Sequence, residues 1–320
     1  MQVVDAKKSQ KVVVLGTGGT IAGTAASASD HTGYTAGQLG VQHLLDAVPA
    51  LQDSLQGHEL VGEQLVQLDS KDMDHATWQA LAQRCAHWLA RPDVDAVVIT
   101  HGTDTLEETA WFLQMVLDTN KPVVLTCAMR PATALAPDGP QNLLDAMVVA
   151  CDPLSRGVMV VCAGLIHSAR AVQKVHPYRL DAFSSGESGP RGFVEQGGVR
   201  WQDLGVLPKV HAHARTALTS NVAQWPWVAV LHSHAGSDAR QIQALVAAGV
   251  KGLVMAGTGN GTVHEKLASA LSEAQAQGVV VRLVSRCAQG QIVGKAAFST
   301  APLGLNVFKA RVSLLLDLLG

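Results

Sequence analysis

A glycine-rich stretch near the start of the chain carries two threonine hydroxyls. Gly16–Gly23 reads GTGGTIAG and directly follows the β-branched run Lys11–Gly16. If that run is a strand, the loop lies at its carboxyl end, where parallel sheets bind their ligands. Glycines would let a ligand approach the backbone, and Thr17 and Thr20 offer hydroxyls, although a plain tight turn explains the glycines equally well. The stretch is not GxGxxG, since Ile21 occupies the third glycine position, and no lysine completes a phosphate loop.

A second polar cluster, THGTDTLEETA at Thr100–Ala110, follows another β-branched run and leads into a helical pattern. Thr103 and Asp104 would lie at a helix N-terminus, where exposed N–H groups favour an anion. Simple capping, with Asp104 as N-cap and Glu107 reaching back to it, explains the acidic residues without any site. Capping does not explain why His101 and several hydroxyls gather at the same strand exit.

Three further segments are weak signals when each is taken alone. Ser70–Met73 (SKDM) follows a predicted strand that ends near Asp69. Lys174 lies in SARAVQKVHP, and a lone lysine is usually a solvated surface charge. Gly257–Gly261 (GTGNG) is another glycine loop at a strand end, for which a plain turn is the simpler interpretation. Only proximity in space would give these residues a shared role.

Histidine pairs suggest a metal site that the sequence does not complete. His211 and His213, or His232 and His234, could share one face of a strand, but no acid or cysteine completes a ligand set. We therefore expect surface or core histidines, no metal and no organic cofactor. The HExxH, GxSxG and SxxK motifs of common hydrolases do not occur in the sequence.

The elements that could position these residues alternate between short β-branched runs and longer helical patterns, which predicts a parallel α/β sheet. Strands are predicted at Lys11–Gly16, Asp95–Thr100, Pro122–Thr126 and Gly157–Cys162. A helix is predicted over Asp74–Leu89, where the residues of one face are Trp78, Leu81, Ala82, Cys85, Trp88 and Leu89. Gly139–Pro140 opens another helix, because proline is tolerated at the first helical position.

The second half of the chain changes character twice. Phe183–Trp201 is rich in serine and glycine and ends in FVEQGGVRW, which predicts a small hairpin. Periodicity then fades, before strands return at Trp227–His232, Gly252–Met255 and Val279–Val284. We therefore predict a large N-terminal parallel-sheet α/β domain (residues 1–205), a linker (206–224) and a smaller C-terminal α/β domain (225–320).

Composition limits the class of protein. Of the 320 residues, 48% are hydrophobic and only 16% are charged, against about 25% charged in typical globular domains. So little charge predicts a large core, or surface that is covered by other subunits. Lys and Arg (24) nearly balance Asp and Glu (26), so we expect no binding of nucleic acid or of an anionic membrane. The longest apolar stretch, Gly157–Ile166, is too short to span a membrane.

Two features predict a cytoplasmic protein. The first ten residues, MQVVDAKKSQ, lack the apolar core of a secretory signal. The five cysteines form an odd set without a CxxC motif, which indicates small core residues in a reducing compartment. They are Cys85, Cys127, Cys151, Cys162 and Cys287.

Three of these motifs, in this order, resemble the bacterial-type L-asparaginase family: TGGTIAG at 17–23, SKDM at 70–73 and THGTDTLEETA at 100–110. The resemblance continues through CAMRPATALAPDGPQNL at 127–143, the Lys174 segment and GTGNG near Asn260, and so covers nearly the whole chain. It implies two α/β domains and hydrolysis of L-asparagine to L-aspartate and ammonia, with weaker glutaminase activity. It also implies a homo-oligomer, a dimer or a tetramer, with sites near the subunit interfaces.

The resemblance assigns a role to each matching residue. Thr20 corresponds to the threonine that attacks the side-chain amide, and Tyr34, in GYTAGQLG, to the tyrosine of a flexible loop beside it. Gly19 and Gly102 are expected among the substrate-binding residues. Thr20 would form an ester and release ammonia, and water would then hydrolyse the ester.

A second group would bind the substrate and stabilise charge. Thr103, Asp104 and Lys174 correspond to a cluster beneath the substrate, where Thr103 and nearby N–H groups would hold the oxyanion. The Lys174 amine would favour an alkoxide-like Thr103. Ser70 and Asp104 match residues that hold the substrate's α-carboxylate and α-ammonium. Asn260 matches an asparagine that a neighbouring subunit contributes.

Two positions depart from the family pattern. Many members carry a glutamate that reaches the partner's tyrosine, but no glutamate follows Glu273 in this chain. Tyr34 would then be supported by Gln289, Gln291 or water, or not at all. Lys71, expected among the substrate-binding residues, stands where relatives often have Gln or Glu. Its positive charge should weaken binding of the substrate's ammonium unless it points away.

Two other functions compete with a stand-alone hydrolase. An ammonia-supplying subunit of an amidotransferase would share the fold, but an extra N-terminal docking domain is then expected, and ten residues precede the first predicted strand. A catalytically silent small-molecule binding protein is the second alternative. The joint presence of Thr20, Thr103, Asp104 and Lys174 argues against it.

Overall fold

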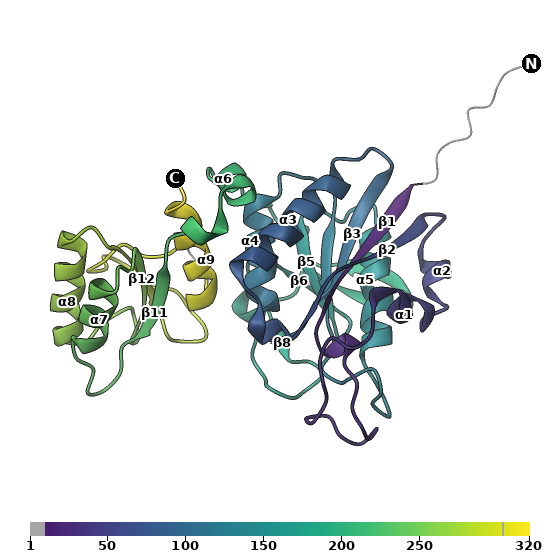
Figure 1. Ribbon diagram of the computed structural model, residues 1–320, viewed down its shortest axis with the longest axis horizontal. Helices are drawn as coiled ribbons and strands as arrows, with labels where there is room; N and C mark the ends of the chain where they lie inside the picture. The colour runs from purple at the N-terminus through teal and green to yellow at the C-terminus, as the bar shows by residue number, and fades with distance from the viewer. Residues whose placement is uncertain (1–9, 303) are drawn as a thin grey trace, which may run out of the picture. The chain divides into compact units, whose positions relative to one another are not determined.

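The computed structural model describes residues 10–302 and 304–320, which form two compact units that divide between Lys209 and Val210 (Figure 1). The large N-terminal and smaller C-terminal α/β units confirm the predicted fold class. The predicted linker, 206–224, includes this point of division. It also contains a short helix, α6 (Ala214–Thr219), and the 3-10 turn η4 (Val222–Gln224).

An eight-stranded sheet forms the centre of the first unit, with the strand order β10-β9-β6-β5-β4-β3-β1-β2. Five neighbouring strands, β2, β1, β3, β4 and β5, run parallel to one another. The pairs β5–β6, β6–β9 and β9–β10 are antiparallel. Their bounds are β1 Lys11–Gly18, β2 Glu59–Leu68, β3 Val94–Thr100, β4 Val123–Thr126, β5 Val158–Cys162, β6 Leu165–Ser168, β9 Gly192–Glu195 and β10 Gly198–Trp201. The sheet is therefore mixed rather than wholly parallel, and β9 and β10 form the predicted hairpin.

Helices cover both faces of this sheet, which explains why its central strands are apolar on both sides (Figure 1). On one face, α1 (Val41–Asp46), α2 (Leu51–Ser54) and α5 (Gly139–Cys151) share one hydrophobic cluster with alternate residues of the strands. On the other face lie α3 (His75–Leu89) and α4 (Leu106–Val116). The described part of this unit also contains the 3-10 turns η1 (Thr20–Ala22), η2 (Ser70–Asp72) and η3 (Gly186–Ser188).

The predicted helix over residues 74–89 is α3, and its local sequence explains both its start and its buried face. The Asp74 carboxylate accepts the Thr77 backbone N–H at 2.7 Å and caps the helix. All members of the predicted apolar face are buried except Trp88, which is half-buried and donates its indole N–H to Glu63.

Two short strands lie outside the large sheet. They are β7 (Gln173–Lys174) and β8 (Phe183–Ser184), which pair antiparallel. Lys174 is therefore part of a two-residue strand, and neighbouring segments must hold it in place.

The second unit contains a parallel three-stranded sheet in the order β11-β12-β13. These strands are β11 (Val228–His232), β12 (Gly252–Gly257) and β13 (Val280–Ser285), close to the predicted runs. A second hydrophobic cluster joins them to α7 (Arg240–Ala247) and α8 (Glu265–Ala276). Helix α9 (Val307–Asp317) also packs against this sheet.

Within residues 10–302 and 304–320, no helix has both the length and the apolar character needed to cross a membrane. The apolar stretch 157–166 instead forms β5 and the start of β6. Among the described residues, no group of three His, Cys, Asp or Glu side chains is arranged to hold a metal ion. His211 contacts Asp317 at 3.1 Å, and His213 contacts the Leu316 carbonyl at 3.1 Å.

Candidate active site

The loops that follow β1 and β3 touch through two glycines. Gly19 has a φ of +80°, and a Cβ on it would lie 2.4 Å from the Cα of Gly102. Gly102 in turn lies against Ser70, whose hydroxyl oxygen would be 2.5 Å from a Cβ at that position. Real Cβ atoms do not approach other atoms so closely, so these positions accept only glycine without rearrangement. The contact brings Thr20 and Thr103, the next residue in each loop, to the same edge of the sheet.

Thr20 lies in the turn η1 and is 5% exposed. Its Oγ1 is 2.6 Å from the hydroxyl of Tyr34, and either group could donate the hydrogen bond. The Tyr34 segment is tied to the same loop, because Gly37 N–H donates to the Gly19 carbonyl. The first threonine of the predicted site therefore has the predicted tyrosine as its direct partner.

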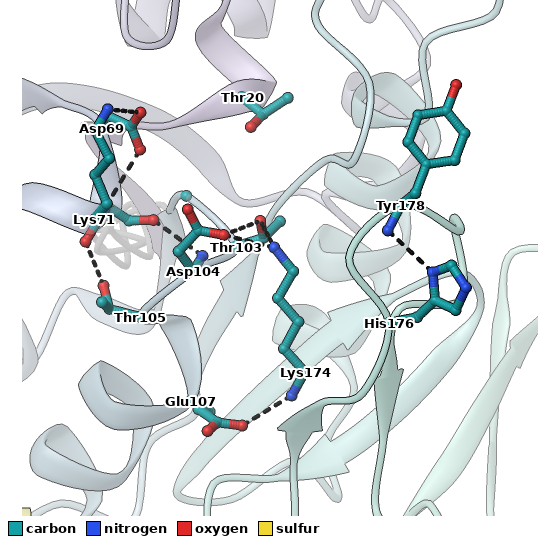
Figure 2. A network of polar contacts seen from close by, with 12 residues as sticks. Thr20, Asp69, Lys71, Thr103, Asp104, Thr105, Glu107, Lys174, His176 and Tyr178 are labelled. Carbon is teal, nitrogen blue, oxygen red and sulfur yellow. Dashed lines mark hydrogen bonds and ion pairs between the residues drawn. The ribbon is translucent and has the colours of Figure 1, made fainter. Parts of the chain in front are cut away.

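Lys174 joins the second threonine to a carboxylate. Its Nζ lies 2.7 Å from Thr103 Oγ1 and 2.6 Å from Asp104 Oδ1 (Figure 2). The Lys174 side chain is 19% exposed and the Asp104 side chain 51%, so the pair is partly shielded from water. Since the ammonium donates to Thr103, the hydroxyl hydrogen of Thr103 is directed elsewhere, and Asp104 Oδ1 at 3.5 Å is one acceptor.

The expected capping arrangement at residues 104–107 is wrong. Helix α4 begins at Leu106 with Thr105 as its N-cap, and no side chain makes a capping bond there. Asp104 instead binds the Lys174 ammonium, and Glu107 Oε2 accepts the Lys174 backbone N–H at 2.8 Å. Both acids are used by a segment about 70 residues away in the chain, which a local pattern does not show.

Ser70 is completely enclosed and connects η2 to the loop after β3. Its Oγ accepts the Asp104 backbone N–H at 3.1 Å, and its carbonyl accepts the Thr105 hydroxyl at 2.8 Å. Because its oxygen is the acceptor of that bond, the Ser70 hydroxyl hydrogen can be donated to another group.

Lys71 points its charge at neighbouring carboxylates. Its Nζ lies 2.5 Å from Asp69 Oδ2 and 3.9 Å from Asp72 Oδ2, and its side chain is 62% exposed. The hydrogen bond that Lys71 donates to Asp69, together with the negative charge of that carboxylate, raises the pKa of Lys71. The positive charge that departs from the family pattern is thus balanced by adjacent acids.

Sequence reasoning did not assign a site role to Glu107 or His101. His101 is completely buried, with Nδ1 2.7 Å from the Gly102 carbonyl. Burial lowers the pKa of His101 to about 4, which keeps the ring neutral near pH 7. Both residues stand inside the motif 100–110, but only the folded contacts show what they touch.

Asn260 belongs to the second unit, unlike the site residues described above, which belong to the first. Its Nδ2 donates to the Val293 carbonyl at 2.9 Å, and its Oδ1 accepts the Val293 N–H at 2.8 Å. Gln289 and Gln291, the residues considered as supports for Tyr34, are exposed residues of the same unit. The residues that the structure gathers around the two touching glycines therefore all come from the first unit.

This arrangement suits nucleophilic chemistry on a small polar molecule. One threonine has a phenol as its partner, and the other has an ammonium and a carboxylate. A hydroxyl becomes an effective nucleophile when a neighbouring group takes its proton and donors stabilise the oxyanion that forms. Exposed carboxylate and buried serine groups lie beside them and could hold the ends of a substrate.

Family models and individual relatives indicate the same family for this chain. Residues 11–204 match the family model described as Asparaginase, N-terminal, and residues 227–318 match the Glutaminase/Asparaginase C-terminal domain. The chain is 37% identical to L-asparaginase 2 of Bacillus subtilis, over 98% of this chain and 83% of that protein. It is 38% identical to the glutaminase-asparaginase of Pseudomonas fluorescens, over 86% of this chain and 75% of that protein.

A solved structure has the same fold. The crystal structure of a probable cytoplasmic L-asparaginase from Campylobacter jejuni superposes with a TM-score of 0.88 at 36% sequence identity. The superposition covers 97% of this chain and 95% of that one.

Proposed function

The chain belongs to the asparaginase family, and on this premise we propose that it hydrolyses the side-chain amide of L-asparagine to L-aspartate and ammonia. The observation that carries the proposal is the convergence of Thr20–Tyr34 and Thr103–Asp104–Lys174 on one edge of the sheet. The names of the relatives, which are L-asparaginases and glutaminase-asparaginases, support the same substrate.

In the first step Thr20 acts as the nucleophile. Its Oγ1 forms a bond to the amide carbon, the C–N bond breaks, and an ester remains on the enzyme. The hydroxyl proton passes by way of Tyr34, at 2.6 Å from Oγ1, and ends on the departing ammonia. Water then attacks the ester, releases aspartate and restores the Thr20 hydroxyl.

Thr103 and Lys174 stabilise the charge that develops on the amide oxygen. The Lys174 ammonium donates to Thr103 Oγ1, and this polarises the Thr103 hydroxyl as a donor. A donor that is already oriented in a partly shielded site needs little reorganisation when the oxyanion forms. Thr103 is 6% exposed, which agrees with a fixed rather than a mobile donor.

Ser70 and Asp104 bind the amino-acid end of the substrate. Asp104 Oδ1 is engaged by Lys174, which leaves Oδ2 for the substrate's α-ammonium. The Ser70 hydroxyl hydrogen is available to donate to the α-carboxylate. Lys71 lies beside these groups, and its pairing with Asp69 limits its repulsion of the substrate's ammonium.

We assign three further properties on the same premise. Asn260, from the second unit, completes the site of a neighbouring subunit in a homodimer or homotetramer, and the 16% charged content agrees with covered surface. The protein acts in the cytoplasm, as the name of the Campylobacter jejuni relative indicates for that protein, although the family also has a relative named as periplasmic. Glutamine is a weaker substrate, because one methylene in a pocket is worth only about 1–3 kcal/mol of discrimination.

Ammonia release by the purified chain, with L-asparagine and L-glutamine assayed side by side, tests the proposed activity. Thr20→Ala should lower kcat for asparagine by at least about 1,000-fold, because the nucleophile is lost. Thr32→Ala, which removes an exposed hydroxyl of the Tyr34 segment, should leave kcat within about threefold. Full activity of Thr20→Ala would refute the assignment. Calorimetric binding of aspartate by a wild-type chain that releases no ammonia would favour a silent binding protein.

A further inference from the structure

The backbone N–H of Lys174 points away from its partner strand. Just beyond the end of β7, the N–H groups of Val175 and His176 both donate to the Ala182 carbonyl of the opposite segment. The Lys174 N–H donates to Glu107 Oε2 at 2.8 Å instead. A carboxylate from helix α4 thus supplies the acceptor that a third strand would otherwise provide.

Glu107 is one of two buried acids among the described residues; the other is Asp145. It lies in the first turn of α4 and is only 7% exposed. A buried carboxylate is costly unless it is hydrogen-bonded, and bonds from N–H groups to a charged acceptor are among the stronger ones. The position at a helix N-terminus also favours its negative charge. Glu107 is therefore a stable anchor for a segment that has little secondary structure of its own.

The two ends of Lys174 are held by neighbouring parts of one segment. Glu107 binds the backbone of Lys174, while Thr103 and Asp104 bind its Nζ (Figure 2). The four methylenes between these ends allow many rotamers, so the position of Nζ depends on where the backbone is fixed. A displacement of about 1 Å at a reacting group can lower a rate by about 100-fold.

We propose that Glu107 is a positioning residue, which fixes the Lys174 backbone so that Nζ meets Thr103 and Asp104 in the reactive geometry. Glu107 does not touch the substrate and acts on the reaction through Lys174. The inference rests on the proposed function, because that function gives Lys174 its role in the reaction.

Two substitutions of Glu107 distinguish the effect of side-chain length from the effect of negative charge. Glu107→Gln keeps the length of the side chain and an acceptor oxygen, but removes the negative charge. Glu107→Asp keeps the charge but is one methylene shorter and cannot reach the Lys174 N–H without movement. Glu108→Gln, at the next position of the same helical turn, is the matched control for loss of a negative charge near the start of α4.

A positioning role predicts that Glu107→Gln retains the catalytic rate that Glu107→Asp loses. We expect Glu107→Asp to lower kcat by about 10- to 100-fold and to alter the pH profile of kcat, with KM within about twofold. Glu107→Gln and Glu108→Gln should retain kcat within about threefold. A purely structural role would lower the melting temperature and leave kcat per folded molecule and its pH profile unchanged. That result would overturn the proposal. So would a loss of kcat in Glu107→Gln that equals or exceeds the loss in Glu107→Asp.

Crystal structures of the two Glu107 variants keep this test separate from the proposed activity. The contact between Lys174 Nζ and Thr103 Oγ1 should remain in Glu107→Gln and be lost in Glu107→Asp. A wild-type chain without ammonia release would refute the activity but not this geometric prediction. An unchanged Lys174 contact in Glu107→Asp would refute the positioning role, whatever the substrate is.

Discussion

A close backbone contact decides which hydroxyls can work together. A Cβ on Gly19 would lie 2.4 Å from the Cα of Gly102, and a Cβ on Gly102 would lie 2.5 Å from the Ser70 hydroxyl oxygen. A side chain at Gly19 would push the loops after β1 and β3 apart and separate Thr20 from Thr103, and one at Gly102 would displace Ser70. At the scale of single residues, the site therefore depends on two positions without side chains as much as on the reactive groups beside them.

His101, next to this contact, should make stability depend on pH. Its pKa is lowered to about 4 by burial, whereas the pKa of an unfolded histidine is near 6.5. Between these values the unfolded chain binds more protons than the folded one, so stability is lost as the pH falls from 6.5 towards 4. The expected loss in the free energy of unfolding from this residue is up to about 3 kcal/mol.

Urea unfolding of the wild type and of His101→Gln at several pH values between 4.5 and 7 measures this effect. The variant has no titrating group at this position, so its stability should depend less steeply on pH across that range. Parallel pH profiles for the two proteins would contradict the prediction.

At the scale of elements, helix α5 holds the exits of two central strands. Asn142 Nδ2 donates to the Cys127 carbonyl just after β4 at 3.0 Å, and its Oδ1 accepts the Ala163 N–H just after β5 at 2.9 Å. The same Nδ2 lies 3.2 Å from Asp138 Oδ2. Asp138 in turn accepts the backbone N–H groups of Met129 and Arg130. One buried amide thus orders the loop at the carboxyl edge of the sheet.

Asn142→Ala should therefore destabilise the fold by about 1–3 kcal/mol, since the buried Cys127 carbonyl loses its partner. Asn120→Ala, which removes the amide of an exposed asparagine between α4 and β4, should change the free energy of unfolding by no more than about 0.5 kcal/mol. Denaturant unfolding of both variants measures the difference. Equal effects of the two substitutions would show that the amide does not carry this role.

At the scale of the whole molecule, the proposed site residues come from different units. Thr20 and its partners belong to the first unit, and Asn260 belongs to the second. In a symmetric assembly, a residue that acts on a neighbouring copy does so in both directions. Two differently inactivated chains can then form one intact site together.

Co-expression of Thr20→Ala chains with Asn260→Ala chains tests this arrangement. If Asn260 acts on a partner's site, each mixed dimer contains one site with both Thr20 and Asn260. Random pairing should then restore about a quarter of the wild-type activity. Activity no higher than the average of the two separate variants would show that Asn260 acts within its own chain, or not at all.

Local patterns in the sequence determined most of the elements. Runs of β-branched residues marked β1, β3, β4, β5 and the three strands of the second unit within a few residues, because a strand buried on both faces must be apolar throughout. The apolar face and the Asp74 cap marked α3 for an equally local reason. The family motifs also predict Thr20 and Thr103 as catalytic residues from the sequence alone. The antiparallel strand β6 was missed, since a four-residue strand carries little pattern of its own.

Tertiary structure alone decided what the polar side chains of these motifs touch. Asp104 and Glu107 have the spacing of a helix cap, yet both bind Lys174, about 70 residues further along the chain. Lys71 carries an unexpected charge, yet Asp69 balances it. A hydrogen bond depends on distance in space, and short-range patterns record only distance along the chain. The sequence therefore named the candidate reactive residues, and folding determined their partners.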